Sequence, residues 1–219
     1  FTLLGDNMHA AVLVNAMSAL CSGLTIFFLY LTIVWLAKRL VRPSAEGTYS
    51  TAQAVAIFGS GLVGALVYAF SDTFWFSAVE GEVYAMSSLF TAVVFWVMTR
   101  WYDRADEPHA LHWIVLIAFL MGLSIGVHLL NLLVIPALVF AYYYRNREDG
   151  RFTFWELVKI LLIGAVILGL LVVLFLPYRA QVAAYGDRFF VNTLGLPYNS
   201  GAAFLMLALL GLLFWALFR

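Results

Sequence analysis

The sequence has few charges, one cysteine and no net charge, and each shortage excludes a class of protein. Only 11% of its 219 residues are charged and 64% are hydrophobic, whereas soluble domains are about a quarter charged. The single Cys21 excludes an intramolecular disulfide and a cysteine metal cluster. A formal net charge of zero provides no overall field that would attract nucleic acid. The composition therefore indicates an integral membrane protein and no nucleic-acid partner.

Motifs of several common enzyme classes are also missing. The sequence contains no Gly-rich phosphate loop, no Ser-x-x-Lys and no HExxH. Its apolar runs lack the series of charges typical of a proton relay. The chain begins at Phe1 without a signal-peptide pattern and ends at Arg219 directly after an apolar run. We interpret it as a piece of a longer protein.

Long apolar runs separated by short polar loops dominate the chain. A helix of about 20 apolar residues crosses a bilayer. The predicted crossings are residues 10–37, 51–70, 84–102, two short spans within 111–144 divided near 126–131, 154–178 and 201–218. The prediction is an all-α, polytopic transmembrane helix bundle of about seven crossings. It forms one domain over 1–219, with outer loops at 71–84 and 179–200.

Lysine and arginine predict the orientation of this bundle. With alternating crossings, nine loop cations fall on one side: Lys38, Arg39, Arg42, Arg100, Arg104, Arg145, Arg147, Arg151 and Arg219. The opposite side receives only Arg179 and Arg188. Since cytoplasmic loops carry the excess of positive charge, the first side is predicted to be cytoplasmic and the second to face outward.

Residues 71–84, SDTFWFSAVEGEVY, link two predicted crossings on the outer side and carry three of the twelve acids. A carboxylate at the mouth of a membrane helix usually faces a water-filled cavity or a partner. If a helix begins at Glu80, then Tyr84 and the serines after it form a polar stripe on one face. Glu82 would point elsewhere. The alternative is an interfacial cap whose acids are merely solvated.

Further polar side chains on the outer side have two readings each. His128 and Asn131 share a predicted helix face, and the histidine either binds a metal or phosphate or forms a hydrogen bond between helices. Arg179 either binds a phosphate with two donors or snorkels to lipid headgroups. Three residues of the last outer loop bind a sugar or serve turns: Asn192, Tyr198 and Asn199.

Two strings carry a family resemblance, E-x-E-V-Y-A at residues 80–85 and G-x-H-x-x-N at 126–131. With longer stretches at 14–36, 74–96, 121–138 and 189–201, they make the chain similar to a bacterial multi-pass membrane family long without a known function. That family is related to the animal protein O-mannosyltransferases that act on plexin and Met receptors, within the GT-C glycosyltransferases. The resemblance implies a GT-C-like transmembrane domain that begins at the second crossing. An acidic motif and the main catalytic carboxylate would precede Phe1, and Asp6 is not their equivalent.

The resemblance implies an enzyme that transfers a mannose-like sugar from a polyprenyl-phosphate carrier to Ser/Thr of exported proteins. Its partners would be that donor, the acceptor protein and the lipid bilayer, in a bacterial inner membrane with a periplasmic active face. Glu80 and Glu82 would support catalysis, and a divalent metal is an open cofactor. The substrate-binding residues would be Tyr84, His128, Asn131, Arg179, Asn192, Tyr198 and Asn199. The alternatives are a transporter or flippase of a lipid-linked substrate, or a scaffold subunit without a site.

Overall fold

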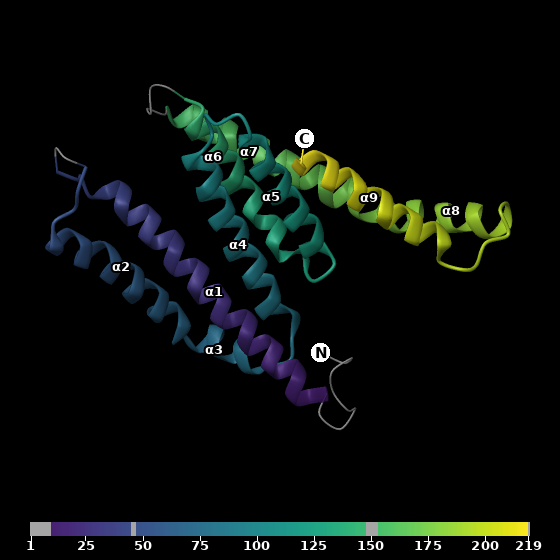
Figure 1. Cartoon of the computed structure of the whole chain (residues 1–219), viewed down its shortest axis with the longest axis horizontal. Coiled ribbons are helices and arrows are strands. Elements are labelled where there is room, and N and C mark those ends of the chain that lie inside the picture. Colours follow the sequence, from purple (N-terminus) through teal and green to yellow (C-terminus); the bar gives the residue numbers. More distant parts are fainter. Residues whose placement is uncertain (1–9, 45–46, 148–152, 219) are drawn as a thin grey trace. The chain divides into compact units, whose positions relative to one another are not determined.

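The computed structural model describes residues 10–44, 47–147 and 153–218, and every regular element in these ranges is a helix. In chain order the elements are α1 (Ala10–Leu40), α2 (Thr51–Ala69), α3 (Asp72–Val79), α4 (Val83–Asp103), α5 (Ala110–Ile125), η2 (Leu129–Val134), α6 (Ile135–Arg145), α7 (Phe154–Leu170), η3 (Leu171–Phe175), α8 (Leu176–Asn192) and α9 (Ser200–Phe218) (Figure 1). The predicted all-α class is confirmed.

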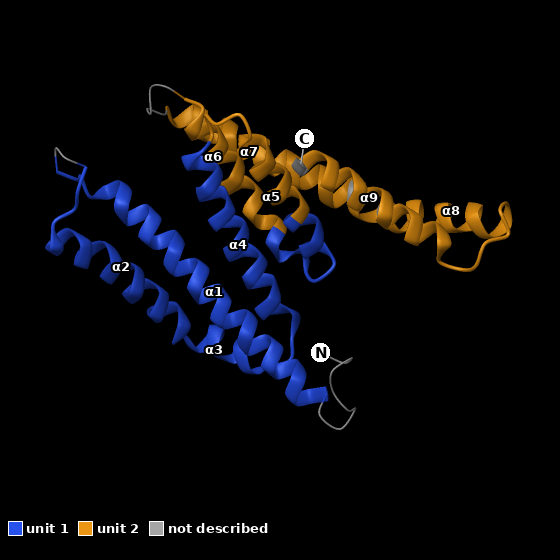
Figure 2. Ribbon diagram, in the orientation of Figure 1, with its two compact units in different colours: residues 1–104, 120–131 blue, residues 105–119, 132–219 orange. Residues whose placement is uncertain are grey.

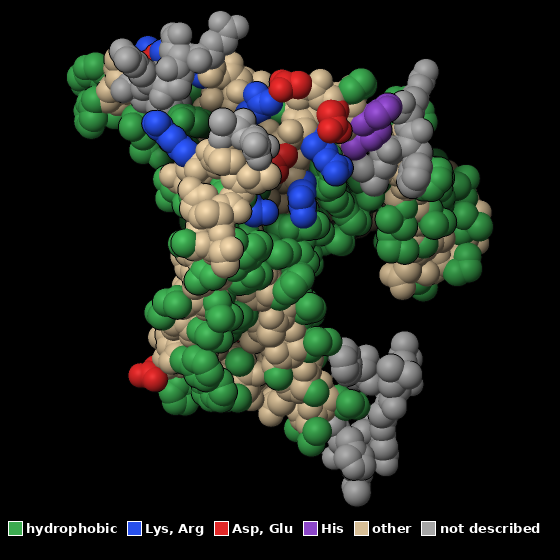
Figure 3. All heavy atoms as spheres, turned by 60° about the vertical axis from the view of Figure 1, so that its left-hand side comes forward, with side chains coloured by type: hydrophobic (Ala, Val, Ile, Leu, Met, Phe, Trp, Pro, Cys, Tyr) green, Lys and Arg blue, Asp and Glu red, His purple; other side chains and the backbone are tan. Residues whose placement is uncertain are grey.

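The helices are apolar on the outside as well as the inside, as expected of a membrane protein. Among the described residues, four helices are long and apolar enough to cross a bilayer: Ala10–Leu40, Thr51–Ala69, Val83–Asp103 and Phe154–Asn192. Three further apolar helices are shorter, Ala110–Ile125, Leu129–Arg145 and Ser200–Ala216. Hydrophobic side chains cover much of the surface (Figure 3), which is favourable only in lipid or against a partner. The chain is an integral membrane protein, and the number of seven crossings stays a prediction.

The chain divides into two compact units, which are described separately (Figure 2). Unit 1 is Phe1–Arg104 with Leu120–Asn131, and unit 2 is Ala105–Phe119 with Leu132–Arg219. The N-terminal residues 1–9, including Asp6, lie outside the described part.

In unit 1, α2 lies alongside α1 because glycines allow the two helices to approach closely (Figure 1). A Cβ atom at Gly61 would lie 2.6 Å from Val34 Cγ2 of α1. The start of α2 is defined by a reciprocal cap in which Ser50 and Gln53 bond each other's backbone N–H.

Helices α1 and α4 run in the same direction and are joined at their C-terminal ends. The ring of Phe28 contacts Trp96 at 5.3 Å between centroids. Further along both helices, Asp103 accepts hydrogen bonds from Trp35 Nε1 at 2.9 Å and from Arg39 at 2.6 Å. The Arg39 guanidinium also lies 3.6 Å from the Trp35 ring centroid. A polar and aromatic clamp therefore fixes the register of the two helices.

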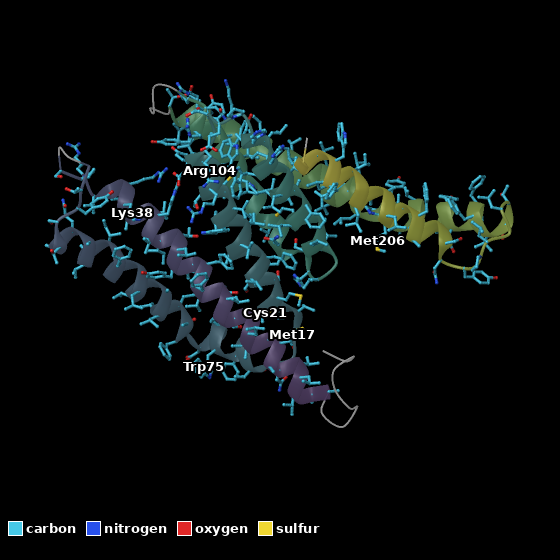
Figure 4. All side chains as sticks on the ribbon, in the orientation of Figure 1. Met17, Cys21, Lys38, Trp75, Arg104 and Met206 are labelled. Carbon is cyan, nitrogen blue, oxygen red and sulfur yellow. The ribbon has the colours of Figure 1, made fainter. Side chains whose placement is uncertain are left out.

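The two ends of unit 1 differ in charge, while the orientation of the unit in the membrane stays a prediction. Lys38 and Arg104 lie at one end of the unit, whereas Met17 of α1 and Trp75 of α3 lie toward the other (Figure 4). The second end includes α3 and the acids Glu80 and Glu82 that follow it. We call it the acidic end of unit 1.

The predicted interruption of residues 111–144 is confirmed. Helix α5 ends at Ile125 and the 3₁₀ helix η2 begins at Leu129, so the break falls at the predicted glycine and histidine. In unit 2, α6 then packs on α7, and a Cβ atom at Gly164 would lie 2.7 Å from Pro136 Cα.

The prediction of a loop from 179 to 200 is wrong for its first part. Residues 154–192 form one continuous helical stretch of 39 residues, about 58 Å at 1.5 Å per residue, or nearly twice the hydrocarbon thickness of about 30 Å. Pro177 lies within this stretch and does not end the helix. It follows a π-helical turn, Leu171–Phe175. The wide turn accommodates a residue that lacks an N–H and crowds the preceding carbonyl.

Helices α8 and α9 form a hairpin with a close crossing at Asp187 and Gly201. The Asp187 carboxylate accepts the backbone N–H of Asn199 at 3.2 Å and of Gly201 at 3.0 Å. A Cβ atom at Gly201 would lie 2.5 Å from the Asp187 backbone. Asp187 therefore caps the start of α9.

Candidate functional site

The acidic turn between α3 and α4 presents two carboxylates at the acidic end of unit 1. Glu80 is the C-cap residue of α3 and Glu82 is the N-cap residue of α4. Both side chains are exposed. The prediction that a helix begins at Glu80 is wrong, since α4 begins at Val83. Within the described part of the chain, neither carboxylate has a hydrogen bond or an ion pair. Both are available to a ligand.

Glycine is required between the two acids because the turn touches α1. A Cβ atom at Gly81 would lie 2.8 Å from Val14 Cγ1 and 3.1 Å from Asn15 Oδ1. The exposed amide of Asn15 therefore lies beside the turn that carries both glutamates. Sequence reasoning missed Asn15. Its only signal was one polar amide near the start of an apolar run.

Tyr84 and His128, which are 44 positions apart in the chain, meet at this end. Their ring centroids are 5.2 Å apart. Tyr84 lies in the first turn of α4 and its side chain is 44% exposed, while His128 is half-buried in the corner between α5 and η2. The structure thus brings together two residues that the sequence proposed separately.

The sequence predicted that His128 lies on a helix face. In the structure it lies between two helices, after α5, and caps the start of η2. Its Nδ1 accepts the backbone N–H of Leu130 at 3.0 Å. Since Nδ1 is an acceptor, the proton of the neutral ring lies on Nε2. In the described residues nothing accepts a hydrogen bond from Nε2. The imidazole therefore has one donor to offer.

Asn131 is fully buried, so it does not line an open cavity. Its exposed fraction is 0%, and its side-chain amide forms hydrogen bonds with Thr91 of α4 and Ser124 of α5. It thus forms the kind of hydrogen bond between helices that the sequence analysis considered for His128, three residues earlier.

Three buried serines form a polar feature, of which the sequence analysis included only Ser87, in the stripe that follows Tyr84. The hydroxyls of Ser18 and Ser22 on α1 and of Ser87 on α4 have no hydrogen-bond partner among the described residues. On α1 they share a face with the buried Thr25. Small side chains there allow close packing of α1, and the spacing of 18, 22 and 25 could have revealed them.

The remaining predicted site residues lie in unit 2. Asn192 ends α8, and Tyr198, at 84% exposed, lies in the link to α9. Asn199 has a φ of 69°, and its backbone N–H donates a hydrogen bond to the Asp187 carboxylate. Its backbone therefore forms part of the turn before α9. The backbone of Arg179 lies within α8, and its side chain lies outside the described part of the structure.

A metal site is not evident in the described residues. They contain no group of three or more His, Cys, Asp or Glu side chains arranged to hold an ion. At the acidic turn, Glu80 and Glu82 offer two carboxylates, whose oxygens are the ligand type of Mg²⁺ and Ca²⁺.

Comparison with known proteins gives one finding. The family model described as protein O-mannosyl-transferase TMEM260 N-terminal domain matches residues 1–151, which include the acidic turn and the His128 corner. No curated protein and no solved structure matches the chain.

Proposed function

Because the chain belongs to the family of the protein O-mannosyl-transferase TMEM260 N-terminal domain, we propose that it is part of a membrane glycosyltransferase. It transfers a mannose-like sugar from a polyprenyl-phosphate carrier to a Ser or Thr hydroxyl of an exported protein. The resemblance of its motifs supports a GT-C type of enzyme in a bacterial inner membrane with a periplasmic active face. The charge difference between the ends of unit 1 supports an acidic end directed away from the cytoplasm.

The reaction is a single displacement at the anomeric carbon of the sugar. The acceptor oxygen forms a bond to this carbon while the bond from the carbon to the phosphate oxygen breaks. The polyprenyl phosphate leaves with the electron pair, and the hydroxyl proton passes to a carboxylate. The configuration of the sugar inverts because attack and departure occur on opposite faces. Such a reaction needs carboxylates near the hydroxyl and hydrogen-bond donors near the phosphate.

Glu80 and Glu82 meet the first requirement. Their unpaired carboxylates accept the hydrogen bond of the incoming hydroxyl and support removal of its proton, or hold a divalent metal that would withdraw charge from the phosphate. Asn15, beside Gly81, offers an amide to the acceptor chain or the sugar.

The donor side is assigned to groups that provide N–H or O–H. His128 offers Nε2–H to the phosphate, and the exposed ring of Tyr84 beside it gives a surface for the sugar. Taken by itself, unit 2 carries four further residues to which the resemblance assigns donor binding: Arg179 for the phosphate, and the exposed Asn192, Tyr198 and Asn199 for the sugar.

The contact between Tyr84 and His128 carries this proposal, because it joins the two motifs of the resemblance at one end of unit 1. The test uses the full-length protein with polyprenyl-phosphate mannose and a Ser/Thr peptide. Glu80→Gln and Glu82→Gln each lower transfer by about tenfold to a hundredfold, and the double variant abolishes it. Asp72→Asn, an exposed acid of α3 outside the turn, is the matched control.

Unchanged transfer in the double variant would overturn the assignment of the acids. If the wild type moves lipid-linked sugar across vesicles without transferring it to peptide, the protein is a transporter. A stable full-length protein with neither activity would be a scaffold subunit.

The assignment of Arg179 has a separate test. A guanidinium engages two phosphate oxygens, and loss of such a contact weakens binding by about 1.5–3 kcal/mol, or roughly tenfold to a hundredfold. Arg179→Ala therefore raises the KM for the donor, and Arg179→Lys restores part of the affinity. Arg188→Ala, an exposed position further along α8, serves as the control. Unchanged donor kinetics for Arg179→Ala would show that this arginine binds lipid headgroups only.

A further inference from the structure

A buried hydrogen-bond network lies directly behind His128. We propose that Asn131 and Thr91 are positioning residues that hold the His128 imidazole as a donor to the lipid-linked phosphate. The inference rests on the proposed function and assigns to the buried polar pair a part in donor binding that the family match does not specify.

The amide of Asn131 uses both of its ends. Its Oδ1 lies 3.0 Å from Thr91 Oγ1, whose single proton is shared with the Ser87 carbonyl at 3.1 Å. Its Nδ2 donates to Ser124 Oγ at 2.9 Å and lies 3.3 Å from Met121 Sδ. Because Ser124 Oγ donates to the Met121 carbonyl, it can only accept from the amide. This determines which end of the Asn131 amide carries the nitrogen.

The same network closes the corner that carries His128. The His128 backbone N–H donates to the Ser124 carbonyl at 2.8 Å, and the Asn131 side chain bonds the Ser124 hydroxyl. His128 and Asn131 are therefore both tied to Ser124. Leu130 N–H, which lies between His128 and Asn131, bonds His128 Nδ1 and prevents rotation of the ring.

The corner also rests on α4 at two points. His128 contacts Tyr84, and Asn131 bonds Thr91. Tyr84 and Thr91 are seven residues apart, so they lie two turns apart on one face of α4. Two contacts on a regular helix determine both the position and the tilt of the corner. The Nε2–H of His128 is consequently held in place before a ligand arrives, which lowers the entropy lost on binding.

Removal of the Thr91 hydroxyl without loss of volume tests this arrangement. In the full-length protein, Thr91→Val breaks the bond to Asn131, whereas Thr91→Ser keeps it. We expect Thr91→Val to raise the KM for polyprenyl-phosphate mannose by about tenfold, which corresponds to about 1.4 kcal/mol, with little change in the KM for the peptide. Thr91→Ser stays within about twofold of wild type. The control is Thr32→Val, because among the described residues the Thr32 hydroxyl donates to the Phe28 carbonyl of its own helix and to no other helix.

A double-mutant cycle separates positioning from general stability. If Thr91 acts through His128, then Thr91→Val combined with His128→Ala is no worse for donor KM than His128→Ala alone. Independent, additive losses would overturn the proposal. The proposal would also be overturned if Thr91→Val lowered kcat equally for every donor and acceptor, in parallel with a lower Tm. A residue that only stabilises the fold gives this pattern.

A milder variant and a binding measurement cover the case in which Thr91→Val does not fold. Ser124→Ala removes the partner of Asn131 Nδ2 but keeps the carbonyl that binds His128 N–H, and we expect about a threefold weaker donor affinity. Binding of a sugar-free polyprenyl monophosphate, measured by the rise in Tm, weakens in the same variants. If the wild type binds this lipid and Ser124→Ala binds it equally well, only the inference fails. If the wild type neither binds it nor transfers sugar, the proposed function fails as well.

Discussion

Gly81 packs so closely on Val14 that any side chain at this position would displace the acidic turn. A Cβ atom would meet Val14 Cγ1 at 2.8 Å, and the branched valine has few other rotamers available. We therefore expect Gly81→Ala to shift Glu80 and Glu82 and to lower transfer by about tenfold to a hundredfold, the effect of a misplacement of about 1 Å.

A second substitution identifies the cause of this loss. Val14→Ala makes room for the new methyl group, so Gly81→Ala/Val14→Ala recovers activity toward that of Val14→Ala alone. Gly59→Ala is the control, since a Cβ atom there has nothing within 4 Å. If Gly81→Ala is fully active, the position of the turn against α1 is irrelevant to the reaction.

The predicted orientation can be measured by cysteine labelling. Single cysteines replace Ser44, before α2, and Thr73, after it, in a chain in which Cys21 is changed to alanine. Because α2 is long enough to cross the bilayer, we expect an impermeant thiol reagent to label Thr73→Cys in intact cells and Ser44→Cys only after permeabilisation. Ala184→Cys in α8 should behave like Thr73→Cys. Labelling of Ser44→Cys and Thr73→Cys from the same side would contradict the predicted orientation.

The clamp at the C-terminal ends of α1 and α4 contributes to stability. Asp103→Ala removes the acceptor of both Trp35 Nε1 and Arg39. These groups are partly exposed to solvent, so we expect a loss of only about 1 kcal/mol in the free energy of unfolding, measured in detergent with denaturant. Glu107→Ala, an exposed acid just beyond the clamp, should have no effect. A similar loss in both variants would mean that net charge rather than the clamp is responsible.

The crossing of α8 and α9 tolerates only glycine. In Gly201→Ala the new methyl group would lie 2.5 Å from the Asp187 backbone, which cannot move as a side chain end can. We expect the start of α9 to separate from α8 and its backbone amides to exchange hydrogen at least about tenfold faster. Gly211→Ala in the same helix has open space around it and should exchange as wild type does. Unchanged exchange in Gly201→Ala would show that the hairpin is not held at this point.

Local chemistry explains which elements could be predicted from the sequence. The start of α2 follows from the Ser50–Gln53 cap, and the break after Ile125 follows from Gly126 with the polar Ser124 and His128 two positions to either side of it. The extension of α8 beyond Pro177 could not be predicted, because it depends on a wide turn that forms before the proline. The exposed apolar surface of α7 and α9 was anticipated from composition alone.

Composition and the spacing of apolar runs thus determined the helical class, the membrane environment and the identity of the two motifs, since these depend on residues near one another in the chain. Only the tertiary structure decided that Tyr84 lies on His128 and that Asn131 is buried against Thr91. It also showed that Asn15 lies beside Gly81. Each of these contacts joins residues far apart in sequence, and the rotation of each helix about its own axis selects which side chains meet. That rotation is determined by packing among all the helices of unit 1, which no local pattern encodes.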